Sequence, residues 1–590
     1  MPLGVRTWVG AIRTWLNIRI SRERLGESLI RDVNHLNSNR EHFMLRVRDY
    51  AYDGMSPELD LSVVTYNSAR WLPGFFDSLL AQSYPLQKIH VWLIDHGSAD
   101  HTQELSAKFS SRNTAAFASI NLLEQPNHGF GAGHNLALRH ARSDFFLVSN
   151  PDLEFERDAI QCALGQASRD VPEIASWEFR QKPYEHPKYC DPVSKETPWS
   201  SHACCLLRRA ALRVVGGYDE SIFMYGEDVE LSYRLRAAGY RLCYVPDAVV
   251  VHHSHQQPGT PKALQHLGSA YANLLIRCRY GSIWSRLCAL PMALANVLRK
   301  PPASMQRARV LHQLLRLPGR DWVRLLCGRI SRPTFGIRGN RYALERAGDW
   351  LAIPALPATQ QVVSIIVRTY SGRRPLLQQA IVSCLHQTWR NLEILLIEDG
   401  CSGRSFADIG AWDDRIRYLP QPKKGRAAAG NAGMAAARGD YLMFLDDDDL
   451  LFPDHVEVLM DALAGCGGNG LAYADSLEVP IDRHHLAVTL KPVRAPHPLY
   501  AVQHVAWRNP FPIQSVLFSR RLYETLGGFD ESLDWLEDWD LWKRYFPAAE
   551  LIGVCKITSL YRAPGDFIGV LRRQRHFARY FSKRHRDAPP

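Results

Sequence analysis

The chain has 590 residues, a formal net charge of +11, and ordinary globular shares of hydrophobic (46%) and charged (22%) residues. A single hydrophobic core rarely organises so long a chain, so we expect at least two domains. The composition excludes a largely disordered protein, and no apolar stretch approaches the roughly 20 residues that a membrane-spanning helix needs.

Residues 1–55 predict a basic amphipathic segment, in which Trp8, Ile12 and Trp15 share an apolar face. Arg6 and Arg13 interrupt any run long enough for a signal peptide. The 12 cysteines of the chain form no C-x-x-C pair, which favours reduced core residues. We therefore expect a cytoplasmic protein with peripheral contact at the inner face of the membrane.

The next segment, 56–280, begins as strand, loop and helix. An apolar strand runs into Thr65-Tyr66-Asn67 and is followed by apolar residues at helical spacing, and a second apolar strand ends at Asp95. Alternating apolar strands and amphipathic helices predict an α/β fold with a mainly parallel, Rossmann-like central sheet. Ligands of such sheets bind beyond the carboxyl ends of the strands, where Asp95 would lie.

Further along this segment, a third strand runs into Asn150-Pro151-Asp152. The segment Gly216–Ser221, with sequence GGYDES, then precedes Glu227-Asp228 at a predicted helix start, and His252 follows a later strand. Gly129–Asn135 is rich in glycine, and we expect it to make flexible turns.

Most of the basic surplus lies between the two halves of the chain. Residues 262–346 contain sixteen Lys or Arg but only two acidic residues, Asp321 and Glu345. Prolines punctuate short helical patterns there. We therefore predict a basic α-helical connector over residues 281–355.

The second half repeats the first in the same order. Strands run into Thr369-Tyr370, into Glu398-Asp399 and into four consecutive aspartates, 446–449, and the sequence GGFDES precedes Glu537-Asp538. A second glycine-rich segment, 425–433, is again expected to make turns. So many matches in one order predict a second copy of the domain at 356–575, followed by a basic tail at 576–590.

Both copies resemble the family-two inverting glycosyltransferases, which have the GT-A fold, and the first resembles rhamnosyltransferases. The resemblance covers about two thirds of the chain and implies a nucleotide-diphosphate sugar as donor. Donor binding is thereby assigned to Thr65, Asn67, Asp95 and Asn150 in the first copy, and to Thr369, Tyr370, Glu398, Asp399 and Asp446 in the second.

The resemblance also implies a divalent cation, Mg²⁺ or Mn²⁺, beside the diphosphate leaving group. Its ligands would be Asp152 and His252 in the first copy, and Asp446 and Asp448, with D-x-D spacing, in the second. Each copy lacks a different part of the family's site: the first has Asn150 in place of a carboxylate, and the second has no histidine equivalent to His252. The N-P-D variant favours dTDP-rhamnose as the first domain's donor.

Asp228 and Asp538 would be the general bases that take a proton from the acceptor hydroxyl. A lone Glu-Asp pair at a helix start is usually a cap, because an anion is stabilised at that end of the helix dipole. Here the pair recurs after the same glycine-containing segment, which favours a catalytic role.

The leading hypothesis is a bifunctional enzyme that adds two sugars to a growing surface polysaccharide or a lipid-linked glycan. One alternative makes one copy a degenerate module that only holds the acceptor. Another is a non-enzymatic protein that binds an anionic surface through its basic segments. No nucleic-acid motif is recognised, so nucleic acid is not an expected partner. The sequence leaves the donor sugars, acceptor, linkage, preferred metal and oligomeric state open.

Overall fold

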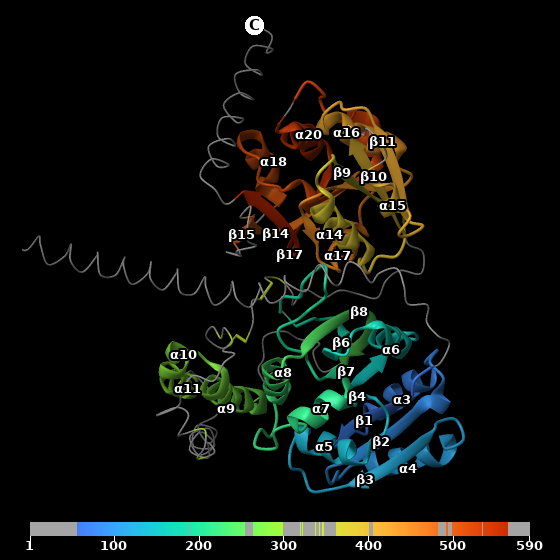
Figure 1. Cartoon of the computed structure of the whole chain (residues 1–590), viewed down its shortest axis with the longest axis vertical. Helices are drawn as coiled ribbons and strands as arrows, with labels where there is room; N and C mark the ends of the chain where they lie inside the picture. Colours follow the sequence, from blue (N-terminus) through green and yellow to red (C-terminus); the bar gives the residue numbers. More distant parts are fainter. Residues whose placement is uncertain are drawn as a thin grey trace, which may run out of the picture. The chain divides into compact units, whose positions relative to one another are not determined.

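The computed structural model describes residues 56–253 except 187, 263–298, 361–400, 405–481, 491–493, 498–564 except 534, and a few residues between 319 and 348. This part of the chain divides into two compact units, one within Tyr50–Ala355 and the other within Leu356–Pro590 (Figure 1). The predicted N-terminal segment 1–55, most of the connector 281–355 and the tail 576–590 lie outside the described residues.

The first unit is built on one mixed, mainly parallel sheet, whose strand order is β3-β2-β1-β4-β7-β6-β8-β5. Strand β1 lies between β2 and β4 and is parallel to both, while β7 is antiparallel to its neighbours β4 and β6. The strands are β1 (Leu59–Thr65), β2 (Ile89–Asp95), β3 (Ser119–Glu124), β4 (Phe145–Ser149), β5 (Leu153–Phe155), β6 (Ile174–Lys182), β7 (Cys204–Arg208) and β8 (Arg241–His252).

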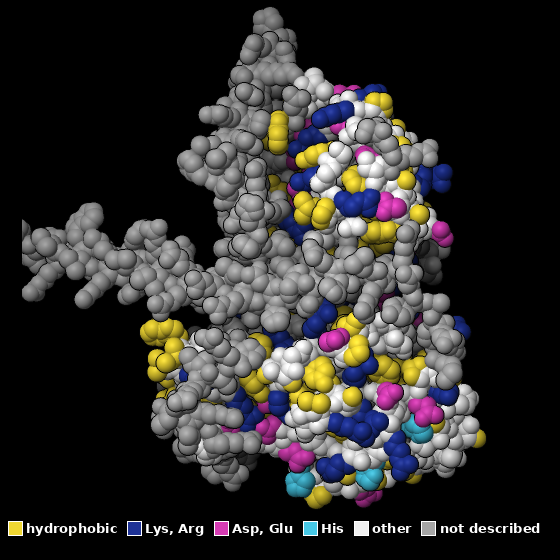
Figure 2. All heavy atoms as spheres, viewed as in Figure 1, with side chains coloured by type: hydrophobic (Ala, Val, Ile, Leu, Met, Phe, Trp, Pro, Cys, Tyr) yellow, Lys and Arg dark blue, Asp and Glu magenta, His cyan; other side chains and the backbone are white. Residues whose placement is uncertain are grey.

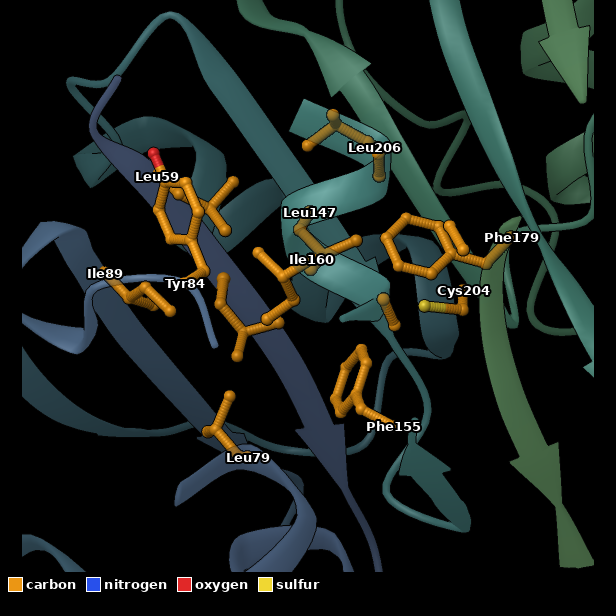
Figure 3. Packing of buried hydrophobic residues seen from close by; sticks show 14 of the residues in the cluster. Leu59, Leu79, Tyr84, Ile89, Leu147, Phe155, Ile160, Phe179, Cys204 and Leu206 are labelled. Atoms are coloured by element: carbon orange, nitrogen blue, oxygen red, sulfur yellow. The ribbon is translucent and has the colours of Figure 1, made fainter. Parts of the chain in front are cut away.

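Helices cover both faces of this sheet because its central strands are apolar on both sides. On β4, Leu147 packs with α3 (Leu72–Leu80), α4 (Thr102–Asn113) and α6 (Ala159–Arg169), as Figure 3 shows for Leu147 and Ile160. Its neighbours Phe146 and Val148 pack on the opposite face, with α5 (Phe130–His140), α7 (Arg209–Val215) and α8 (Glu227–Ala237). The sheet is therefore wound on both faces, as the sequence predicts.

A helical extension packs on α8 in the same unit. It consists of α9 (Ala263–Tyr280), α10 (Ile283–Leu287) and α11 (Ala289–Leu298). The ring of Tyr233, on α8, lies 5.6 Å from that of Tyr280 and 4.8 Å from that of Phe335. Described residues of the predicted connector thus join the core of the first unit.

The second unit repeats the topology with strand order β11-β10-β9-β12-β16-β14-β17-β13, and β15 pairs with β14. Its strands are β9 (Val363–Thr369), β10 (Leu392–Asp399), β11 (Ile416–Gln421), β12 (Tyr441–Asp446), β13 (Leu450–Leu451), β14 (Gly470–Ile481), β15 (Lys491–Val493), β16 (Val516–Ser519) and β17 (Glu550–Pro564). Its helices are α14 (Arg374–Leu385), α15 (Ala407–Gly410), α16 (Arg426–Ala436), α17 (His455–Leu463), α18 (Pro498–Trp507), α19 (Arg520–Leu526) and α20 (Glu537–Tyr545). Short 3₁₀ turns occur at Leu86–Lys88, Ile513–Ser515 and Phe546–Ala548.

The two glycine-rich segments are the start of helices, so the expectation of flexible turns is wrong. Gly129 and Gly425 precede α5 and α16 with φ of 98° and 97°, and the remaining glycines lie within the helices. Small residues are needed there because these helices lie close to the sheet: a Cβ on Gly433 would lie 2.3 Å from Cγ2 of Ile366.

The same side-chain bonds hold both helices to the GGYDES and GGFDES segments. Asn135 of α5 accepts from Tyr218 N (2.8 Å) and donates to Tyr218 O (3.0 Å). Asn431 of α16 accepts from Phe529 N (2.7 Å) and donates to Phe529 O (3.0 Å). The repeat seen in the sequence is therefore a repeat of tertiary contacts.

We predict that Gly433→Val lowers the free energy of unfolding of the second unit by about 1–3 kcal/mol, because the added methyl groups overpack α16 against Ile366. Urea denaturation followed by tryptophan fluorescence measures this. Gly465→Val is the matched control, since its Cβ would meet no described atom within 4 Å, and its effect should stay within about 0.5 kcal/mol. Equal destabilisation by both variants would contradict the packing argument.

Candidate active sites of the two units

A cavity of about 880 Å³ opens in the first unit beyond the carboxyl ends of β1 and β4. Five of the residues that the sequence singles out line it: Asn67, Asn150, Asp152, Asp228 and His252. The parallel sheet brings them together, although they are spread over 186 positions of the chain. The volume suits a ligand of several rings.

Thr65 and Asp95 do not belong to the lining of this cavity. They are partners in the β1–β2 pairing, and the Thr65 hydroxyl donates to Asp95 Oδ1 (3.0 Å). Burial by itself would raise the pKa of Asp95, but hydrogen bonds from Ser98, Gln103 and Thr65 outweigh it and hold that pKa below its ordinary value. Asp95 is therefore a fixed carboxylate at the end of its strand.

Asp152 and His252 face each other across the β5–β8 pairing. Asp152 Oδ2 lies 3.4 Å from His252 Nε2, and both side chains are largely buried. His252 Nδ1 lies 2.8 Å from Gln181 Oε1, which suits a proton on Nδ1 and leaves Nε2 as the acceptor directed at Asp152. His253 points elsewhere, with Nε2 2.9 Å from Glu154 Oε1 and its ring stacked on Trp71.

Asp152 and His252 could provide two of the ligands of a hard cation. Nowhere in the described part of the chain do three or more His, Cys, Asp or Glu side chains gather closely enough to hold a metal ion by themselves. A carboxylate and an imidazole whose acceptor atoms lie 3.4 Å apart can, however, share a cation whose other ligands are water and a diphosphate.

Glu227 and Asp228 open α8, as the sequence predicts. Burial raises the pKa of Glu227 to about 8, and the neighbouring Asp228 adds to the effect. Glu227 Oε2 is buried and finds no hydrogen-bond partner among the described residues. Burial also raises the pKa of Asp228, although Val229 N, which donates to it (2.8 Å), and Lys188 oppose this. The first pocket thus contains more carboxyl groups than nearby positive charges can compensate.

The cavity also contains residues that the sequence did not single out. Lys188 contacts the Trp199 ring at 4.2 Å and is paired with buried Glu178, and His202 accepts from or donates to the Tyr218 hydroxyl at 2.7 Å. Arg341, Tyr342 and Glu345, from the predicted connector, line it as well. No repeated motif marks these residues, so only the fold could reveal them.

In the second unit, Glu398 takes the place of Asp95 but makes different contacts. Thr369 pairs with Glu398 in the β9–β10 register, as Thr65 does with Asp95. Glu398 is fully buried and accepts a hydrogen bond from the Tyr418 hydroxyl, whereas the Thr369 hydroxyl donates to Asp447 (2.7 Å). Asp399 accepts from Lys424 N (2.8 Å) and Gly425 N (3.0 Å), and so holds the turn before α16. Tyr370 is exposed.

The aspartates that end β12 are bound by arginines. Asp446 Oδ1 accepts from Arg368 (2.6 Å) and Oδ2 accepts from Arg426 (3.0 Å). Arg373 donates to Asp447 (2.7 Å) and to Asp448 (2.6 Å). Burial alone would raise the pKa of Asp446, but Arg368 and Arg426 outweigh it and lower that pKa. For Asp447 burial prevails and raises the pKa to about 6.

Glu537 and Asp538 open α20, the counterpart of α8. Glu537 Oε1 accepts from Arg368 (3.0 Å) and Arg426 (2.7 Å), so its charge is neutralised where that of Glu227 is not. Burial, with Glu537 beside it, raises the pKa of Asp538 to about 6, and Asn509 donates to Asp538 Oδ2 (2.8 Å).

Residues 61–213 and 364–469 both match the model of Glycosyl transferase family 2. Each of the two units thus contains a segment that is similar to this family. The sheet order and helix placement of both units are those of the GT-A fold. The chain spans about 60% of the length of the first curated relatives that it matches.

Curated proteins with similar sequences are named as glycosyltransferases. An uncharacterized glycosyltransferase of Rickettsia prowazekii is 27% identical over 197 residues, which span 32% of this chain and 60% of that protein. The N-acetylglucosaminyl-diphospho-decaprenol L-rhamnosyltransferase of Mycobacterium tuberculosis is 28% identical over 270 residues, which span 38% of this chain and 84% of that enzyme. Among solved structures, the mannosyltransferase PcManGT of Pyrobaculum calidifontis, in complex with GDP-Man and Mn²⁺, is 19% identical, with a TM-score of 0.34 over 52% of this chain and 97% of that one.

We predict opposite effects of amide substitution at Glu227 in the first domain and at Glu537 in the second. Folding raises the pKa of Glu227 from 4.5 to about 8, so this residue increasingly destabilises the first domain as the pH rises from 4.5 to 8. Glu227→Gln should therefore raise the free energy of unfolding at pH 8 by at least about 1 kcal/mol and have little effect near pH 5. Urea denaturation at both pH values measures this.

Glu537→Gln serves as the comparison and should destabilise the second domain, because Arg368 and Arg426 lose a charged partner. Equal stability of the wild type and Glu227→Gln at pH 8 would refute the lack of charge compensation in the first pocket.

Proposed function

We propose that this chain is a bifunctional inverting glycosyltransferase. Each domain would transfer a sugar from a nucleotide-diphosphate donor to a growing surface polysaccharide or a lipid-linked glycan. The observation that carries the proposal is the repeated placement of a Glu-Asp pair at the start of α8 and of α20, in domains that also repeat the strand-end acids. Two active domains in one chain would raise the local concentration of the acceptor end for the second transfer.

In this proposal Asp228 and Asp538 act as general bases. Each carboxylate accepts the proton of the acceptor hydroxyl as the oxygen attacks the anomeric carbon, and the bond to the nucleotide diphosphate breaks on the opposite side. The raised pKa of both groups suits this role, because a base is most effective when its pKa lies near the working pH.

Asp152 and His252 would hold a divalent cation in the first domain, Mg²⁺ or Mn²⁺. When bound, such a cation neutralises the negative charge of the departing diphosphate. The fit rests on the directed Nε2 of His252, on its distance of 3.4 Å from Asp152, and on the unneutralised Glu227 in the same cavity.

A dTDP-rhamnose donor in the first domain is supported by two observations. The Asn150-Pro151-Asp152 variant is part of the sequence's resemblance to rhamnosyltransferases. The Mycobacterium tuberculosis relative is named an L-rhamnosyltransferase, with a diphospho-decaprenol acceptor in its name. We extend both features, the donor and a lipid-linked acceptor, to this chain as part of the proposal.

Separate replacement of the two bases tests bifunctionality. We expect Asp228→Asn and Asp538→Asn each to reduce one of two transfer activities by about 10²- to 10⁴-fold and to leave the other unchanged. The full chain would be incubated with a panel of nucleotide sugars and a lipid-linked acceptor, and the products would be separated by mass. Asp77→Asn and Asp414→Asn, at exposed positions, are the controls.

Two different truncated products would support two active domains. Loss of all product in one variant and no change in the other would instead favour the reading in which one domain only holds the acceptor.

We also propose that the enzyme works at a membrane surface. None of the described helices is long and apolar enough to cross a bilayer. Large hydrophobic side chains nevertheless gather on α10 and α11, as the yellow patch at the left of the lower coloured part of Figure 2 shows. Three of them lie on α10 and two on α11, and all are exposed: Ile283 (55%), Trp284 (67%), Leu287 (63%), Leu290 (38%) and Leu294 (42%). This patch lies in the most basic stretch of the chain, which suits an anionic lipid surface.

We therefore predict that Trp284→Ser with Leu287→Ser weakens binding to vesicles that contain phosphatidylglycerol by about tenfold or more, since two exposed apolar side chains that would enter the lipid surface are lost. Flotation of the full chain at low and high salt measures this, and high salt should weaken the wild type as well. Val214→Ser, at a 68% exposed position on α7, is the control. Binding that neither salt nor the double variant changes would refute this surface.

A further inference from the structure

Three arginines of the second domain bind its acidic cluster. Arg368 bridges Asp446 and Glu537, and Arg426 bridges the same two carboxylates from the other side. Arg373 bridges Asp447 and Asp448. Both oxygens of Asp446 are thus occupied by guanidinium groups.

The first domain has apolar residues at all three positions. Arg368 lies opposite Asp446 in the β9–β12 pairing, whereas the β1–β4 pairing, with Val63 opposite Ser149, brings Val64 level with Asn150. Arg426 is the first residue of α16, and Phe130 is the first residue of α5. Arg373 and Trp71 are the N-caps of α14 and α3. The two domains therefore differ at all three of these positions together.

This arrangement does not fit the cation that the sequence predicts at Asp446 and Asp448. A divalent cation would have to displace guanidinium groups from Asp446 and to approach three positive charges that no ordinary pH removes. The first domain is the reverse case, since Asp152 faces an imidazole and Glu227, unlike Glu537, forms no ion pair with an arginine of the described residues.

We propose that the second domain holds the diphosphate of its donor through Arg373 and Arg426 instead of a divalent cation. The inference rests on the proposed function of this domain as a donor-binding transferase. Arg368 is 4% exposed and stays between Asp446 and Glu537, where it fixes their positions. Arg373 and Arg426 are 25% and 38% exposed, so their outer faces are accessible to a ligand.

The chemistry of these two side chains suits a diphosphate. A guanidinium group presents five N–H donors in a planar fork that matches phosphate oxygens. Arg426 also begins α16, whose N-terminal amides favour an anion. The carboxylates that now bind both arginines keep them extended toward the site before a donor arrives.

The first test counts Mn²⁺ bound to the full chain by electron paramagnetic resonance. We expect one ion per chain, lost in Asp152→Asn and retained in Asp448→Asn. Arg373→Trp with Arg426→Phe, which places the first domain's residues in the second, should add a second ion. Two ions in the wild type, one of them lost in Asp448→Asn, would overturn the inference.

The second test titrates inorganic pyrophosphate into the full chain in the presence of EDTA, by calorimetry. Arg373→Gln with Arg426→Gln should weaken binding by about tenfold or more, because each charged hydrogen bond contributes substantially to affinity. Arg374→Gln, which removes a neighbouring arginine that pairs with Asp408, should leave it unchanged. Equal affinity in the wild type and the double variant would overturn the inference.

The two tests also separate this inference from the proposed function. A wild-type chain that binds no Mn²⁺ would refute the proposed cation of the first domain, while the pyrophosphate titration would still decide the role of the arginines. A chain that passes both tests yet transfers no sugar with any donor would refute the proposed function and leave the anion site standing.

Discussion

Both domains depend on the parallel pairing of their first strand with the two strands beside it. This pairing places Thr65 beside Asp95 and Thr369 beside Glu398, and it brings Asn150 and Asp446 to the same edge of their sheets. Residues on distant segments can then share one site, because parallel strands all end at the same edge. A one-residue slip in either pairing would turn these side chains to the wrong face and abolish the site.

The same backbone supports two different distributions of charge. In the first domain, the acids Asp152 and Glu227 share a cavity in which Asp152 faces an imidazole, and the pKa of Glu227 rises to about 8. In the second, Glu537 lies between two arginines. Since the Glu-Asp pair and the helix that carries it are retained in both, the divergence concerns how negative charge is compensated, not how the acceptor hydroxyl would be approached.

The sequence predicted the parts of this structure that follow from periodicity and repetition. It predicted two α/β domains, the strand ends and the Glu-Asp pairs, because apolar spacing and ordered motifs are local properties of the chain. It could not predict the helical character of Gly129–Asn135, since glycine favours turns unless close packing against a sheet requires it. It also could not place Lys188 or Tyr342 in the cavity, or pair Arg368 with Glu537, because such contacts join segments far apart in the chain.

The three arginines of the second domain occur together because each carboxylate of the acidic cluster needs a cationic partner. Arg368 alone would leave Asp447 and Asp448 without a cationic partner, and Arg373 alone would leave Asp446 and Glu537 in the same state. Each buried carboxylate without a partner destabilises the fold, so replacing one apolar residue by arginine is of little use unless the others change too. The set Arg368, Arg373 and Arg426 is therefore best understood as one coupled change. An enzyme that combines it with the first domain's site would carry out one transfer that depends on a divalent cation and one that does not.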